Sequence, residues 1–432
     1  MHLGRRKPAD CMRILQLTPG TGNYHCGSCL RDNALVRGLR ARGHDVLIVP
    51  LYLPHVTDGY SEAEGTPVFL SGISVFLEQK YPQFRRIPGW LNRVFRSSVL
   101  LRLAANLAGM TSARDLGEAT VAMLQGTECR QSGEVERLVS WLRTQPRPDV
   151  ICLSNSLLSG LARPLKEEFR VPVVCTMQGE DSFLDGLTDP YRLRAWDLLA
   201  RRCADIDHFV AVSHYYRATM SRRLGLDPER VTVVYPGIAV GEPLPSAPMP
   251  DPPVIGFLAR MEPSKGLGAL VDAFLQLEMP GVRFRIAGAK TSLDDGFVRS
   301  LRRKLPSDVE FLPNLDLAAK REFLRGLTVL SVPATCGEAF GLYILDAWAA
   351  GVPVVLPRHG VFPELLEKTG GGILYDPDDD TALAAALRQL LCDSAAACQM
   401  GAAGRQAILT DFSIEAMAQK VETMLLHVTH AA

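Results

Sequence analysis

Short apolar runs alternate with helix-forming segments along most of this chain, and this alternation restricts the possible fold more than any other feature. Residues 12–18 are an apolar run, residues 30–42 carry small and apolar side chains at helical spacing, and residues 45–50 are a second apolar run. Two strands joined by a crossover helix lie parallel in one sheet. Further apolar runs of this kind occupy residues 149–154, 171–176, 206–213 and 231–238. The pattern predicts an α/β fold with a doubly wound parallel sheet.

A proline-rich stretch divides the chain into two such series. Residues 241–253 contain six prolines, a composition typical of a linker between domains. A second series of strands and helices begins after it, with apolar runs at residues 254–259, 282–288, 309–312, 328–332 and 352–356. A chain of 432 residues also exceeds what one hydrophobic core usually supports. We therefore expect two domains, at residues 1–240 and 254–411, followed by a C-terminal segment at 412–432.

Composition excludes several classes of protein. Lys plus Arg and Asp plus Glu number 47 each, so the balance of charge does not indicate general nucleic-acid binding. No apolar run approaches the ~18 residues of a membrane span, and residues 1–10 are too short and polar for a secretory signal. The ten cysteines are scattered, which favours a reducing compartment over a disulfide framework. We expect a cytoplasmic protein.

One basic stretch leaves two interpretations open. Residues 85–102 contain five arginines and no acid, interleaved with apolar side chains such as Trp90 and Phe95. An amphipathic basic helix can lie on an anionic membrane, which would place the protein peripherally at the inner face of that membrane. The alternative is a helix whose charged face is simply solvated.

The glycine-rich loop at residues 19–28 does not match a dinucleotide-binding loop. It lacks the G-x-G-x-x-G pattern, and the strand after it ends without an acid, so a nicotinamide enzyme is disfavoured. Cys26 and Cys29 form a C-x-x-C pattern at the start of a helix, where a thiol pKa can be lowered. No second cysteine pair completes a zinc site, and we interpret the two cysteines as small residues of a tight loop.

Residues 333–351 carry the most informative group of polar residues. A buried strand ends at Pro333, and good helix formers run from about Phe340 to Gly351. The first backbone N–H groups of such a helix are unpaired and suit a phosphate; here they belong to Ala339, Phe340, Gly341 and Leu342. Glu338 lies in the loop and Asp346 about two turns further on. Carboxylates beside a phosphate site suggest sugar hydroxyls at Glu338 and ribose hydroxyls at Asp346, as in a nucleotide-sugar site.

This segment resembles the C-terminal signature of the retaining glycosyltransferases of family 4, which have the GT-B fold. In that signature two glutamates flank seven residues, and here Glu338 and Asp346 flank seven. The resemblance also implies that Arg260 and Lys265, in a loop that ends in Lys-Gly, hold the donor diphosphate. Cations there agree with the chemistry, because cleavage of a sugar–phosphate bond leaves negative charge on the diphosphate.

Two residues of the first half are implicated in the same way. Gly27 is the retained member of the family's paired glycine, where the backbone approaches the donor. Gln178 stands where the family commonly carries a histidine near the donor sugar, and it can bond a hydroxyl but cannot take a proton. The acids after it, Glu180 and Asp181, are either acceptor contacts or loop acids.

The resemblance implies two Rossmann-like domains of the GT-B fold, with the donor held mainly by the second and residues 412–432 packed back on the first. It implies a retaining transferase that moves a sugar from a nucleoside-diphosphate sugar to a hydroxyl of a glycan, lipid or small molecule, without metal or cofactor. One alternative is a nucleotide-sugar epimerase of the same fold. Another, suggested by Asp346 and Gln178, is a sugar-nucleotide-binding protein without turnover.

Overall fold

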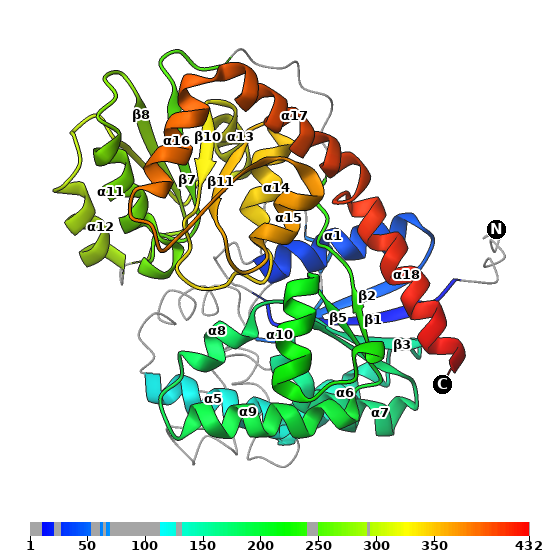
Figure 1. The fold of residues 1–432 in the computed structure, drawn as a ribbon. Coiled ribbons are helices and arrows are strands. Elements are labelled where there is room, and N and C mark those ends of the chain that lie inside the picture. The colour runs from blue at the N-terminus through cyan, green and yellow to red at the C-terminus, as the bar shows by residue number, and fades with distance from the viewer. Residues whose placement is uncertain are drawn as a thin grey trace. The chain divides into compact units, whose positions relative to one another are not determined.

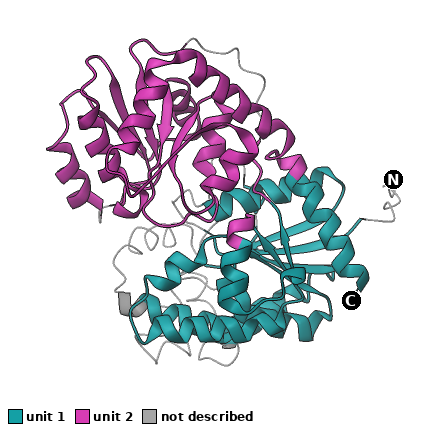
Figure 2. Ribbon diagram, in the orientation of Figure 1, with its two compact units in different colours: residues 1–212, 217–234, 417–432 teal, residues 213–216, 235–416 magenta. Residues whose placement is uncertain are grey.

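The chain folds into two compact α/β units (Figures 1 and 2). The computed structural model describes residues 11–20, 27–52, 61–63, 66–69, 113–126, 132–239, 249–291 and 294–431. Unit 1 comprises Met1–Val212, Arg217–Val234 and Met417–Ala432, and unit 2 comprises Ser213–Tyr216 and Tyr235–Ala416. Each unit contains a six-stranded parallel sheet with helices on both faces, so the predicted α/β class is confirmed.

The sheet of unit 1 has the order β2-β1-β3-β4-β5-β6. Its strands are β1 (Arg13–Thr18), β2 (Asp45–Pro50), β3 (Val150–Leu153), β4 (Val173–Met177), β5 (His208–Ala211) and β6 (Val231–Val233). Because helices cover both faces, most strand residues are buried, which explains why the strands read as mainly apolar runs. The helices are α1 (Gly27–Ala41), α5 (Ala113–Gln125), α6 (Ser132–Leu142), α7 (Ala162–Phe169), α8 (Glu180–Asp185), α9 (Tyr191–Arg202) and α10 (His214–Leu224).

The last helix of the chain, α18 (Ile414–Ala431), completes the core of unit 1. Its apolar face, including Val421 and Leu425, packs in one buried cluster with Ile14 of β1. On the polar side of the helix, Glu422 accepts hydrogen bonds from Arg42 Nε at 2.7 Å and pairs with His44 Nε2 at 2.8 Å.

The sheet of unit 2 has the order β12-β11-β10-β7-β8-β9. Its strands are β7 (Val254–Leu258), β8 (Arg283–Gly288), β9 (Glu310–Pro313), β10 (Val329–Ser331), β11 (Val354–Pro357) and β12 (Gly372–Tyr375). The helices are α11 (Leu267–Leu277), α12 (Asp295–Arg302), α13 (Leu317–Arg325), α14 (Leu342–Ala349), α15 (Phe362–Thr369), α16 (Ala382–Cys392) and α17 (Ser394–Thr410). Its core is fully buried around Ile255, Phe257 and Leu387. The central strands β7 and β10 lie side by side, so the loops that follow them meet at one edge of the sheet.

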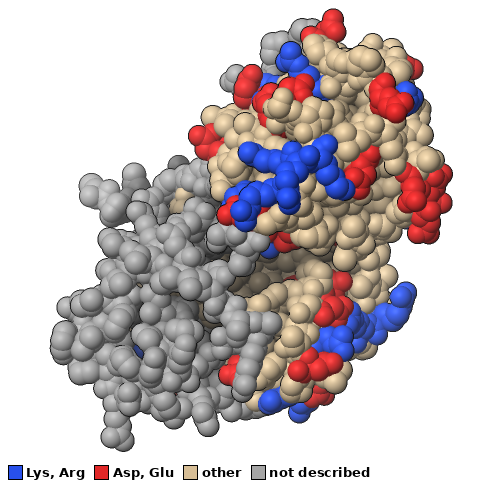
Figure 3. Space-filling model, turned by 90° about the vertical axis from the view of Figure 1, so that its left-hand side faces the viewer, with Lys and Arg blue, Asp and Glu red and all other residues tan. Residues whose placement is uncertain are grey.

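Three predicted features fall on residues outside the described ranges: the basic stretch 85–102, Cys26, and residues 241–248 of the proline-rich linker. Among the helices of the described ranges, none is both long and apolar enough to cross a membrane. Basic and acidic side chains are interspersed over the described surface drawn in Figure 3, apart from one group of Lys and Arg on unit 2. The view therefore agrees with the even balance of charge in the sequence.

Candidate functional site

The loop between β10 and α14 carries the predicted carboxylate Glu338. Helix α14 begins at Leu342, with Gly341 as its N-cap at φ 87°, so it starts later than the predicted position near Phe340. Ala339 and Phe340 therefore belong to the loop, not to the helix. Among the described residues, we find no hydrogen-bond acceptor for the backbone N–H groups of Ala339, Phe340 and Gly341. These three N–H groups are available to an anion or a hydroxyl.

Lys265 forms an ion pair with Glu338, between Nζ and Oε1. The Lys265 side chain is 27% exposed and the Glu338 side chain is 15% exposed, so the pair is partly buried. Lys265 ends a single 3-10 turn (Pro263–Lys265) that leads into α11. The next residue, Gly266, has φ 73°, and a Cβ there would overlap the carbonyl oxygen of Pro333. Only glycine lets the two loops approach this closely, and the approach brings the ammonium to the carboxylate.

A second contact joins the same two loops. The Thr335 N–H donates to the carbonyl oxygen of Ser264 at 2.9 Å. Because Ser264 precedes Lys265 and Thr335 lies in the loop that carries Glu338, this bond fixes the two loops to one another through their backbones. The ion pair therefore joins segments that the backbone already holds together.

Arg260 lies in the loop after β7, as the sequence predicts, but it does not share the Lys265–Glu338 pair. Its side chain is 62% exposed, and its guanidinium lies 3.3 Å from the Glu262 carboxylate. An ion pair this exposed contributes little to holding the side chain in one place. The structure thus places one predicted cation on Glu338 and leaves the other at the surface of the same loop.

Asp346 lies on α14, 3.3 Å from Lys320 Nζ of the neighbouring helix α13. Both side chains are partly buried, at 26% and 16% exposure. The sequence reasoning missed Lys320, because the pairing depends on how α13 and α14 pack and neither residue is near the other in sequence. A cation beside a carboxylate gives this end of α14 two groups that can bond the hydroxyls or phosphate oxygens of a nucleotide.

Tyr343, in the first turn of α14, was also missed. Its hydroxyl is buried and has no hydrogen-bond partner among the residues that the structure describes. Burial and the nearby charge of Glu338 raise the Tyr343 pKa well above its ordinary value, so the phenol remains protonated. A buried donor of this kind next to Gly341 can bond a group that comes close to the loop.

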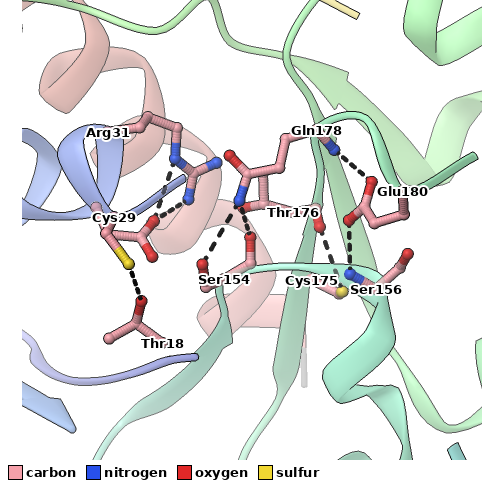
Figure 4. A network of polar contacts seen from close by, with 10 residues as sticks. Thr18, Cys29, Arg31, Ser154, Ser156, Cys175, Thr176, Gln178 and Glu180 are labelled. Carbon is pink, nitrogen blue, oxygen red and sulfur yellow. Dashed lines mark hydrogen bonds and ion pairs between the residues drawn. The ribbon is translucent and has the colours of Figure 1, made fainter. Parts of the chain in front are cut away.

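Gln178 and Gly27 belong to unit 1. Gln178 follows β4, and its side-chain amide donates to the carbonyl oxygen of Ser154 at 2.6 Å (Figure 4). Gly27 is the exposed first residue of α1. Their roles toward a donor remain predictions.

Glu180 is the first residue of α8, and its carboxylate accepts hydrogen bonds from backbone N–H groups. It is 5% exposed and accepts from the N–H groups of Ser156 at 2.8 Å and Gln178 at 2.7 Å (Figure 4). It also accepts from the N–H group of Gly179 at 3.0 Å. These bonds join the ends of β3 and β4. The sequence left Glu180 open as either an acceptor contact or a structural acid. The geometry favours a structural acid, which fixes the backbone around Gln178.

Burial raises the pKa of the Cys175 thiol of unit 1 well above its ordinary value. Burial raises the pKa of Cys152 to about 12, and the Cys29 thiol is buried 3.7 Å from the Thr18 hydroxyl. A thiol with a raised pKa is a poor nucleophile and metal ligand. Within the described ranges, no group of three or more His, Cys, Asp or Glu side chains is arranged to hold a metal ion.

Two family models match the chain, one in each half. Residues 121–242 match "Glycosyltransferase Family 4" and residues 245–407 match "Glycosyl transferases group 1". The glycogen synthase of Mycobacterium tuberculosis is 27% identical over 63% of this chain and 67% of its own length. The phosphatidyl-myo-inositol mannosyltransferase of Mycobacterium leprae is 32% identical over 46% of this chain and 54% of its own length, so the chain spans about half of that relative.

Solved structures share the fold at low sequence identity. Alr3699/HepE of Anabaena, solved in complex with UDP, has a TM-score of 0.66 at 18% identity, covering 96% of this chain and 100% of that one. The sucrose-phosphate synthase of Thermosynechococcus elongatus has a TM-score of 0.67 at 17% identity, covering 98% and 100%. The predicted GT-B fold is therefore confirmed. With a family match in each half and this fold, the chain belongs to the glycosyltransferases of family 4 and is a glycosyltransferase.

Proposed function

We propose that this glycosyltransferase moves a sugar, with retention of configuration, from a nucleoside-diphosphate sugar to a hydroxyl of its acceptor. The observation that carries the proposal is the pairing of Lys265 with Glu338 beside the N–H groups of Ala339 and Phe340, which have no acceptor among the residues that the structure describes. One small region of unit 2 thus offers a cation and N–H donors for a diphosphate and a carboxylate for sugar hydroxyls. These are the groups that a nucleotide-sugar donor requires.

In the proposed reaction the bond between the anomeric carbon and the diphosphate oxygen breaks while the acceptor oxygen bonds to the same carbon. The electron pair of the broken bond stays on the diphosphate. Lys265, Arg260 and the N–H groups from Ala339 to Leu342 stabilise that charge. The acceptor hydroxyl gives its proton to the leaving diphosphate oxygen, so no protein nucleophile is needed. Attack from the face that the diphosphate leaves retains the configuration.

Glu338 and Asp346 have different roles in this proposal. Glu338 bonds hydroxyls of the transferred sugar, which gains positive charge at its anomeric carbon, and Asp346 bonds the ribose. Lys265 is held by Glu338 before the donor binds. The incoming diphosphate competes for the ammonium, and the released carboxylate oxygen becomes available to the sugar. The cationic side chains supply the positive charge, so we expect turnover without a metal ion or a cofactor.

Relatives suggest which donors and acceptors to try first. One relative is named a GDP-mannose-dependent phosphatidylinositol monomannoside mannosyltransferase, and a solved neighbour was crystallised with UDP-glucose. We propose UDP-glucose and GDP-mannose as first donors. A lipid-linked acceptor would also give the basic stretch 85–102 a use at an anionic membrane, where the protein would be peripheral.

The experiment begins with a panel of nucleotide sugars screened for thermal stabilisation, because a ligand that binds only the folded state raises the melting temperature. Each stabilising donor is then incubated with the protein, with and without sugar and lipid acceptors, and the products are identified. A new glycosidic product with an acceptor supports the transferase. A changed sugar with donor alone would indicate the epimerase, and stabilisation without any consumption would indicate a binding protein.

A further inference from the structure

Four residues from the first half of the chain, Ser213–Tyr216, belong to unit 2. They form the N-cap and first turn of α10, and Ser213 is fully buried. The Ser213 hydroxyl accepts from the Tyr216 N–H at 3.0 Å, as an N-cap serine does, and donates to the carbonyl oxygen of Ala339 at 2.8 Å. Its single proton is therefore committed to the loop that carries Glu338.

This bond sets the direction of a neighbouring N–H group. In a planar trans peptide the carbonyl and the following N–H point in opposite directions. Because Ser213 holds the Ala339 carbonyl, the Phe340 N–H points away from Ser213. The preceding peptide is held in the same way, since the carbonyl of Glu338 accepts from the Val361 N–H at 3.1 Å. The directions of two consecutive N–H groups, those of Ala339 and Phe340, are thus set by hydrogen bonds to the carbonyl oxygens of the same peptide groups.

The segment that carries Ser213 is itself held by Glu364 of α15. One Glu364 oxygen accepts from the His214 N–H at 2.9 Å and from the Tyr235 hydroxyl at 2.8 Å, and the other accepts from the Tyr215 N–H at 2.8 Å. The first N–H groups of a helix have no partner within it, and a carboxylate there is stabilising. Glu364 and the N-cap Ser213 together therefore satisfy the first three N–H groups of α10.

The segment also packs closely against the loop. A Cβ at Gly337 would overlap the Tyr215 hydroxyl, so Tyr215 lies directly on the backbone before Glu338. The loop is thus contacted at Gly337 by Tyr215 and at Ala339 by Ser213. Gly337 and Ala339 are the two neighbours of Glu338 in the chain, so both contacts hold the backbone next to the carboxylate that the proposed function uses.

We propose that Ser213 is a positioning residue for glycosyl transfer: its hydroxyl holds the Ala339 peptide so that the Phe340 N–H faces the donor diphosphate. The role rests on the proposed function, because it acts through an N–H group that the proposal assigns to the donor. Misplacement of a group that meets developing charge lowers the rate more than it weakens binding. Loss of the hydroxyl therefore affects kcat more than donor affinity.

The test uses Ser213→Gly, Ser213→Ala and the control Asp393→Gly. Glycine is a good N-cap residue, so Ser213→Gly removes the bond to Ala339 with little loss of helix capping, whereas alanine removes both. Asp393 caps α17 by accepting from the Ala396 N–H at 2.9 Å, and it has no part in the proposed site. The three variants and the wild type are compared by melting temperature, by kcat and KM with UDP-glucose or GDP-mannose, and by calorimetric Kd for UDP or GDP.

We expect Ser213→Gly and Ser213→Ala to lower kcat by about tenfold or more. The Kd should change less, and Asp393→Gly should keep the wild-type kcat. Both Ser213 variants lose the buried bond to Ala339, and Ser213→Ala, which also loses the helix cap, should melt at a lower temperature than Ser213→Gly. A wild-type kcat in Ser213→Gly, or a loss that follows the melting temperature, would overturn the positioning role while leaving the proposed function intact. A wild-type protein that consumes no nucleotide sugar would instead overturn the proposed function, and this role with it.

Discussion

The Lys265–Glu338 pair allows stability and catalysis to be separated in one experiment. The variants are Lys265→Met, Glu338→Gln and the double variant. Lys265→Met leaves a partly buried carboxylate without its cation, Glu338→Gln leaves the cation without its carboxylate, and the double variant leaves neither charge. The two single changes should therefore cost more stability together than the double change does.

The size of this coupling follows from the exposure of the two side chains. Exposed pairs contribute about 0.2–1 kcal/mol, and removal of one partner from a fully buried pair costs about 3–5 kcal/mol. At 27% and 15% exposure, the pair lies between these limits. We expect a coupling free energy of about 1.5 kcal/mol, which corresponds to about 3–6 °C in melting temperature for a domain of this size. The Lys304–Asp272 pair of unit 2, at 3.0 Å and with 54% and 55% exposure, is the control and should couple by about 0.3 kcal/mol.

The control variants are Lys304→Met, Asp272→Asn and their double variant. Stability is measured by urea unfolding of all six variants without ligand, and turnover is measured with a nucleotide-sugar donor and acceptor. The double variant should recover stability relative to the sum of the single changes, but it should not recover turnover, because Lys265 acts on the leaving diphosphate. Turnover should remain down by about a hundredfold whenever Lys265 is replaced. A coupling no larger than that of the control pair would refute the structural reasoning. Near-normal turnover of Lys265→Met would refute the proposed role of the cation.

Three further predictions test other parts of the molecule. Glu338→Gln should lower kcat with a modest change in donor KM, whereas Asp346→Asn should mainly raise donor KM, since the ribose is remote from the reacting bond; steady-state kinetics with the opposite result would exchange the two roles. Burial and His427 lower the His208 pKa, so the folded state binds fewer protons than the unfolded state, and the free energy of unfolding should fall as pH drops from 7.5 to 5.5; the fall should be smaller in His208→Gln, by urea unfolding. If residues 85–102 bind a membrane, co-sedimentation should require anionic vesicles and weaken with salt, and binding to neutral vesicles would exclude that interpretation.

The strands could be predicted from the sequence because both faces of each sheet are covered. The run 254–259, for example, is β7 (Val254–Leu258) almost residue for residue. Where both faces are buried, most side chains of a strand are apolar, and the run itself marks the element. The spacing of Glu338 and Asp346 was equally accessible, since one loop and one short helix carry both and no distant contact is needed to relate them.

The partners of these residues could not be predicted in the same way. Lys320 pairs with Asp346 because α13 packs beside α14. Nothing in the sequence distinguishes Lys320 from other lysines on amphipathic helices. Ser213 precedes a helix and carries the ordinary signal of an N-cap, but nothing local to it indicates that its proton goes to Ala339, 126 residues away. Such contacts depend on the order of strands in a sheet, which the pattern of apolar runs leaves open.

The glycines of this region carry a different kind of information in the sequence and in the structure. In the sequence, Gly266 and Gly337 indicate only turns and breaks. In the structure, each marks a place where one backbone lies against another group: Gly266 against the Pro333 carbonyl, and Gly337 against the Tyr215 hydroxyl. The loops of Lys265 and Glu338 are therefore located by contacts with no room for a side chain. Because these contacts leave little freedom to the backbone, the N–H groups of Ala339 and Phe340 keep their direction without support from a donor. Donors that are already in place lose little free energy to rearrangement when charge develops on the diphosphate.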